Sequence, residues 1–170
     1  KEKKATGQPI NLNFICTHNS RRSHFAQIWA QTLATYFEIP NVFCYSGGTE
    51  TTRIYPTVLE TFRNIGFQQQ QLSEGKNPVF ALRFSATSAP VIAFSKKYDD
   101  LFNPQANFCA IMTCSQADKN CPLVSGSEKR IPITYEDPKI ADDTTQELEK
   151  YEECARQIGA ELYYVFNRVI

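Results

Sequence analysis

The sequence predicts a single α/β domain, residues 1–170, with three layers: helices on both faces of a central, mostly parallel sheet of four strands. One observation is that segments with strand character alternate along the chain with segments of helical periodicity, as in βαβ units. The other is that 170 residues with 42% hydrophobic content suffice for one buried core.

The first unit is a strand, a tight loop and a helix. Residues 10–15 alternate between apolar and polar side chains, as expected of a strand, and lead directly into Cys16. From about residue 22, apolar residues recur every three or four positions, which predicts a helix with one buried face; we place His24 on its surface. Residues 42–45 form a second strand, and residues 56–65 a second helix that ends at Gly66.

The rest of the chain supplies two more sheet strands and a long helix. Residues 108–113 are almost continuously apolar, which is typical of a strand buried on both faces. Residues 129–133 are a further strand, and residues 144–166 have the periodicity of a helix. Between them, residues 79–84 and 90–94 are expected to pair as a β-hairpin, and residues 98–102 to form a short helix.

Composition excludes several classes of partner. A formal net charge of zero gives no reason to expect nucleic acid or an anionic membrane surface. No apolar run approaches the roughly 18–20 residues that span a bilayer, so no membrane is expected. Six cysteines in a chain of this size predict reduced thiols and a cytoplasmic protein. With no Cys-x2-Cys pair and only two histidines, we expect no metal site and no bound cofactor.

The segment that carries the chemistry joins the first strand to the first helix. A thiolate at Cys16 would face backbone N–H groups and the positive end of the helix, which lowers a cysteine pKa from about 8.5 toward roughly 4–7. The planar guanidinium of Arg22 could close a loop around a tetrahedral oxyanion. The alternative is a structural cysteine beside two solvated arginines. The predicted oxyanion loop comprises Cys16, Thr17, His18, Asn19, Ser20, Arg21, Arg22 and Ser23.

The loop resembles that of the low-molecular-weight protein tyrosine phosphatase superfamily, which includes thioredoxin-coupled arsenate reductases. The resemblance rests on Cys-Thr-x-Asn-Ser-x-Arg-Ser after an N-terminal strand. It implies a phosphotyrosine phosphatase I-like fold, with Cys16 as nucleophile, Arg22 as oxyanion ligand, and Asn19 and Ser23 as loop supports. His18 stands where the superfamily usually has Gly. Arg21 stands where it usually has a second Cys, so a disulfide within the loop is not possible.

Two further positions extend the resemblance. Asp137, in an Asp-Pro pair after the last strand, matches the general acid that protonates a leaving oxygen, with Glu136 as competitor. Ser46 begins a Ser-Gly-Gly-Thr turn like the one that supports the loop in the superfamily. Whether a potassium ion or the ammonium of Lys96 or Lys97 lies beside the loop stays open. The resemblance covers residues 1–66 and about 95–170, so residues 67–94 are expected to be an insertion. This insertion could cover the active site or mediate oligomerisation through Val79, Phe80, Phe84 and Ile92.

Cys114 and Cys121 bear on whether the sequence resembles the arsenate reductases or the phosphatases of this superfamily. The segment Cys-Ser-x-Ala-Asp-x-Asn-Cys-Pro resembles the redox loop of arsenate reductases, which implies an arsenate reductase whose disulfide cascade is reset by an external, thioredoxin-like thiol reductant. From the residues alone, the alternative that Cys114 and Cys121 are two unrelated thiols stays open. The alternative function is a phosphomonoesterase that forms a phosphocysteine at Cys16 and acts on phosphate esters. A third is an inactive anion-binding domain.

Overall fold

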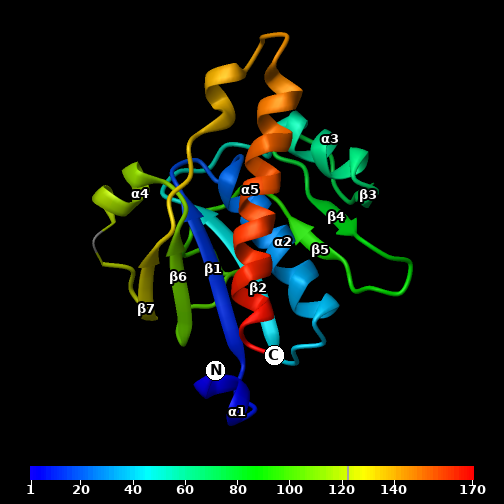
Figure 1. The fold of residues 1–170 in the computed structure, drawn as a ribbon. Helices are drawn as coiled ribbons and strands as arrows, with labels where there is room; N and C mark the ends of the chain where they lie inside the picture. The colour runs from blue at the N-terminus through cyan, green and yellow to red at the C-terminus, as the bar shows by residue number, and fades with distance from the viewer. Residues whose placement is uncertain (122) are drawn as a thin grey trace.

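A computed structural model describes residues 1–121 and 123–170; Pro122, the last residue of the predicted redox motif, lies outside the described residues. Four strands form the central sheet in the order β2-β1-β6-β7, and all three pairings are parallel (Figure 1). The predicted three-layer α/β/α fold with a four-stranded sheet is confirmed. The strands are β1 (Ile10–Cys16), β2 (Val42–Gly48), β6 (Phe108–Met112) and β7 (Ser127–Pro132).

Alternation along the strands divides the buried side chains between two cores. Phe14 and Ile111 belong to the larger core, whereas their neighbours Ile15 and Met112 belong to the smaller one on the other face. Three helices cover the larger core, where Phe25 and Phe62 pack with ring centroids 5.6 Å apart. These helices are α2 (Arg22–Tyr36), α3 (Pro56–Asn64) and α5 (Glu147–Asn167), while α4 (Ser115–Asn120) lies over the smaller core.

A second, antiparallel sheet contains the predicted hairpin, β4 (Phe80–Arg83) with β5 (Val91–Ala93), and adds β3 (Gln68–Gln71) at its edge. Figure 1 shows it beside α2 and α3. Leu82 and Val91 are buried in the larger core, and Phe80 and Phe84 pack against it. Two of the four apolar side chains expected to cover the site or to join two copies, Phe80 and Phe84, are therefore used in packing within the chain. That residues 67–94 are an insertion within the family stays a prediction.

The sequence-based prediction of several local elements is wrong. Residues 98–102 form turns rather than a helix, and the expected polar loop after Cys114 is helix α4. The chain also has two short helices that were not predicted, α1 (Glu2–Ala5) and η1 (Pro138–Ala141). Among the described residues, no helix combines the length and apolarity needed to cross a bilayer.

Candidate active site

Cys16 is the last residue of β1, an inner strand of the parallel sheet, and its side chain is buried. Residues 17–21 connect this strand end to α2, which begins at Arg22. The backbone N–H of Asn19 donates to Cys16 Sγ over 3.1 Å, and Ser23 Oγ lies 3.1 Å from the same sulfur. Because the Asn19 side-chain amide donates to Ser23 Oγ over 2.9 Å, the Ser23 hydroxyl proton is free to point at the sulfur.

Asn19 is the centre of the loop's own structure. Its φ of 45° is in the left-handed region, which asparagine tolerates better than most residues, as predicted. Its Oδ1 accepts a hydrogen bond from the backbone N–H of Lys96 at 2.9 Å. Its carbonyl oxygen lies 2.9 Å from Nε2 of His24. Asn19 thus connects the loop to α2 and to the segment that follows β5.

The predicted lowering of the Cys16 pKa is wrong in direction. Burial raises the pKa of the Cys16 thiol, and the nearby Cys114 raises it further. The Ser23 hydroxyl, the Arg22 guanidinium and the backbone at Ser20 act in the opposite direction by favouring the thiolate. The positive charge of Arg22 is shared with Asp137, so it cannot fully offset the cost of burying a thiolate.

Gly48 ends β2 beside the loop and is paired in register with Cys16. A Cβ at Gly48 would lie 2.6 Å from the carbonyl oxygen of Thr17 and 2.7 Å from the backbone nitrogen of Asn19. Only glycine allows this close approach. Ser46 is fully buried on the same strand, and its Oγ lies 3.4 Å from Nδ1 of His24. The Ser-Gly-Gly segment, predicted as a turn, is instead the end of β2. It borders the loop, and Ser46 contacts the loop through His24.

His24 is buried, not on the surface of its helix as predicted from the sequence. Burial lowers the pKa of His24 to about 3, and the nearby ammonium of Lys96 lowers it further, so the ring is neutral at pH 7. A neutral ring that donates from Nε2 to the Asn19 carbonyl leaves Nδ1 to accept from Ser46. In the sequence, the only signal that His24 supports the loop is its position as a polar residue directly after Ser23.

Lys96 is buried immediately behind the loop. Its Nζ donates to the Phe94 carbonyl over 3.2 Å and lies 4.3 Å from the centroid of the Phe94 ring and 5.3 Å from that of Phe102. Burial lowers the pKa of Lys96 to about 8. Gln27 on α2 donates to the carbonyls of Cys44 and Ile92, both at 3.1 Å.

Arg22 and Asp137 meet at the open side of the loop. The two side chains form an ion pair, and Arg22 Nη1 also donates to the Tyr135 carbonyl over 2.9 Å. The other carboxylate oxygen of Asp137 caps η1 by accepting from the backbone of Lys139 at 3.2 Å. Asp137, rather than Glu136, is thus the carboxyl group that the structure brings to the predicted anion ligand.

Of the other predicted oxyanion ligands, two have side chains directed elsewhere. Arg21 bonds to Tyr151 and Asp142 and lies over the Tyr55 ring. His18 pairs with Glu50 at 3.4 Å on the exposed rim. Thr17 and Ser20 are buried within the loop.

Cys114 is buried directly after β6, the strand next to β1. Its Sγ lies 3.5 Å from Thr17 Oγ1 and accepts the backbone N–H of Ala117 at 3.3 Å, which caps α4. Cys16 and Cys114 share the smaller core. Cys121 is half-buried at the other end of α4, where Arg130 donates to its carbonyl over 2.9 Å and pairs with Asp118 at 2.6 Å.

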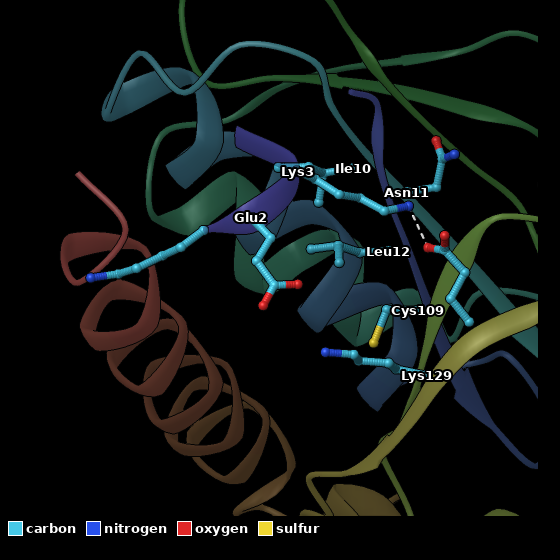
Figure 2. Close-up of a pocket in the computed structure, with 9 residues that line it drawn as sticks. Glu2, Lys3, Ile10, Asn11, Leu12, Cys109 and Lys129 are labelled. Carbon is cyan, nitrogen blue, oxygen red and sulfur yellow. Dashed lines mark hydrogen bonds and ion pairs between the residues drawn. The ribbon is translucent and has the colours of Figure 1, made fainter. Parts of the chain in front are cut away.

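A hollow of about 470 Å³ lies at the other end of the sheet (Figure 2). It is bordered by Ile10, the first residue of β1, so it is about 20 Å along the strand from Cys16. Lys3 pairs with Glu128 at its edge, and Cys109 is half-buried there. The hollow is therefore not part of the candidate site. No cluster of three potential metal-ligating His, Cys, Asp or Glu side chains occurs in residues 1–121 and 123–170.

Comparison with known proteins identifies the family. The chain is 30% identical over 131 residues to an arsenate reductase of Staphylococcus aureus (strain Newman). The alignment covers 75% of this chain and 77% of that protein. The chain belongs to the arsenate reductase family. An arsenate reductase 2 of Staphylococcus epidermidis is 27% identical over 128 residues, with the same two coverages. No model of a known protein family matches the chain.

Solved structures of low sequence identity share the fold, and they include a phosphatase of the type that the loop resembles. An arsenate reductase in the phosphate-binding state has a TM-score of 0.60 at 17% identity, over 95% of this chain and 99% of the other. A low-molecular-weight phosphotyrosine phosphatase from Vibrio cholerae O395 has a TM-score of 0.63 at 12% identity, over 94% and 95%. A thioredoxin-dependent arsenate reductase of Corynebacterium glutamicum has a TM-score of 0.50 at 22% identity, over 99% and 69%.

Proposed function

We propose that this protein reduces arsenate by a thiol cascade that starts at Cys16 and passes through Cys114 and Cys121. The observation that carries the proposal is the placement of two buried thiols at the ends of adjacent parallel strands, on either side of Thr17. Hydrolysis of a phosphate ester needs only the first of these thiols. A second thiol within the same small core supplies the electrons that reduction requires.

The first step forms a bond between Cys16 Sγ and arsenic while one arsenate oxygen leaves as water. Arg22 would bind the oxyanion by exchanging its contact with Asp137 for paired hydrogen bonds to arsenate. Asp137, once released, carries the proton that the leaving oxygen needs. The Ser23 hydroxyl and the Asn19 N–H hold the thiolate that attacks.

In the second step the Cys114 thiolate attacks Cys16 Sγ. A disulfide forms, and the electron pair of the sulfur–arsenic bond stays on arsenic, which leaves as arsenite. Cys121 then attacks Cys114, which restores the Cys16 thiol and leaves a Cys114–Cys121 disulfide. This last step requires a rearrangement: the two cysteines flank a six-residue helix, about 10 Å apart along its axis, and a disulfide needs Cα atoms within roughly 7 Å. Helix α4 must therefore unwind.

The resulting disulfide needs an external dithiol, and we propose a thioredoxin-like protein as its source. Three points support this: Cys121 is half-buried at the end of α4, Leu123 beside it is exposed, and one structural relative is a thioredoxin-dependent arsenate reductase. The cascade returns all three thiols to the reduced form, which fits the predicted cytoplasmic location.

The test measures arsenate-dependent NADPH oxidation with thioredoxin and thioredoxin reductase. We expect Cys16→Ser, Cys114→Ser and Cys121→Ser each to abolish turnover, and Cys109→Ser, a half-buried thiol at the far end of the sheet, to retain it. After a single arsenate addition, mass spectrometry of Cys121→Ser should find a disulfide between Cys16 and Cys114. Full arsenate turnover by Cys114→Ser would show that the cascade is wrong. Hydrolysis of p-nitrophenyl phosphate without any arsenate turnover would favour the phosphomonoesterase.

A further inference from the structure

Two adjacent arginines at the start of α2 contact opposite ends of one short segment. Arg22 pairs with Asp137, the residue before η1, and Arg21 pairs with Asp142, the residue after it. Both arginine side chains are largely buried, at 13% and 12% exposure. The segment between the two carboxylates is thus bound to the oxyanion loop at each end.

The Arg21 end is a closed hydrogen-bonded ring. Arg21 donates from Nε to the Tyr151 hydroxyl and from Nη2 to Asp142, and the Tyr151 hydroxyl donates to the second oxygen of Asp142 at 2.6 Å. Burial raises the pKa of Tyr151, and Asp142 raises it further, so this hydroxyl stays protonated. The Tyr55 ring, 4.1 Å below the guanidinium, stacks on Tyr151. A guanidinium used in this way cannot also bind the oxyanion.

We infer that Arg21 is a positioning residue that holds the acid Asp137 at the loop through Asp142 and η1. The inference rests on the proposed role of Asp137. When Arg22 binds an oxyanion, it releases Asp137. One of the two attachments of the segment is then lost in the step in which the acid acts. Arg21 has no such conflict, because its donors are engaged by Tyr151 and Asp142. It therefore keeps Asp137 within reach of the leaving oxygen while Arg22 binds the substrate.

The first test does not depend on activity. Hydrogen exchange of the amides of residues 139–142 should be faster in Arg21→Met than in wild type, because the backbone bonds of this segment, such as that from Asp142 N to the Lys139 carbonyl at 3.0 Å, lose their attachment to α2. Arg53→Met changes an exposed arginine just after the loop and should exchange like wild type. Unchanged exchange of this segment in Arg21→Met would overturn the inference.

The second test asks whether Arg21 acts through Asp137. In single-turnover reactions with arsenate, followed by formation of the Cys16–Cys114 disulfide in Cys121→Ser protein, Arg21→Met should slow the reaction roughly tenfold. The dissociation constant for inorganic phosphate should stay within about twofold, because Arg21 does not contact the oxyanion. In an Asp137→Asn background, Arg21→Met should cause no further loss. A further tenfold loss there, or much weaker phosphate binding, would show a structural or ligand-binding role instead.

These two tests separate the inference from the proposed function. If arsenate produces no disulfide in Cys121→Ser protein, the proposed reductase fails, and the same comparison is made with p-nitrophenyl phosphate hydrolysis in the wild-type cysteine background. Arginine-to-lysine substitution at position 21 provides a graded control: lysine keeps the charge but has no planar pair of donors, so it should recover only part of the lost rate.

Discussion

The buried neutral His24 predicts how the stability of the fold depends on pH. In the unfolded chain a histidine has a pKa of about 6.5, whereas burial lowers the pKa of His24 to about 3 in the folded protein. Between these values the unfolded chain binds more protons, so the free energy of unfolding falls as the pH falls below 6.5. At pH 5.0 this one residue should cost about 2 kcal/mol relative to pH 7.5.

Urea unfolding of wild type and His24→Gln at pH 7.5 and 5.0 measures this contribution. Glutamine can still donate to the Asn19 carbonyl but does not titrate. Whatever the substitution costs at both pH values cancels in the comparison between them, as do the other titrating groups. We expect wild type to lose about 2 kcal/mol more than His24→Gln over this interval.

The chain has only two histidines, which provides a matched control. His18 is on the rim with 44% of its side chain exposed, and His18→Gln removes this second imidazole. In that variant the single remaining imidazole belongs to His24, and its proton NMR signal should not shift between pH 8 and pH 5. A signal with a midpoint near 6.5, or equal losses of stability in wild type and His24→Gln, would refute the reasoning.

Two further predictions concern the thiols. Ser23→Ala removes a hydrogen bond to the Cys16 sulfur, so it should raise the pKa of Cys16 and slow its alkylation by iodoacetamide at pH 7 roughly tenfold; an unchanged pH profile, with Cys121 as internal reference, would contradict this. Arg130→Met removes the contacts that hold α4 in the thiol form, so it should favour the Cys114–Cys121 disulfide by roughly three- to tenfold in a dithiothreitol redox buffer. Lys129→Met, on the same strand, should not change that equilibrium.

Local patterns predicted the sheet and the position of the nucleophile. The alternation of residues 10–15 predicted a strand that the structure extends by one residue to Cys16, and the order of strands and helices limited the topology to a few possibilities. Helix α4 was not predicted because it is short and most of its residues are polar. Its start depends on the Cys114 sulfur accepting the Ala117 N–H, a cap that the usual preference for oxygen-bearing side chains does not include.

The roles of Arg21 and His24 could not be predicted, because their partners are remote in the sequence. Arg21 bonds to residues 121 and 130 positions further along the chain. His24 bonds to the adjacent loop and to Ser46 on another strand. A polar side chain in a helical pattern is normally placed in solvent, and only these partners make its burial favourable. Residue type identified the loop, but contacts across the fold decide which of its side chains face the oxyanion.

The segment 67–94, predicted to be an insertion, is linked by hydrogen bonds to the oxyanion loop. Asn77, just before β4, makes two hydrogen bonds to the backbone of Ser95, at 2.7 and 3.2 Å. The Ser95 hydroxyl in turn donates to the His18 carbonyl at 3.1 Å, and the next residue, Lys96, donates its backbone N–H to Asn19. The connection between β3 and β4, through Ser95 and Lys96, therefore helps to hold two residues of the oxyanion loop in place. A substitution in residues 67–94 can alter the geometry around Cys16 from a distance, because the chain that leaves β5 supports the loop from behind.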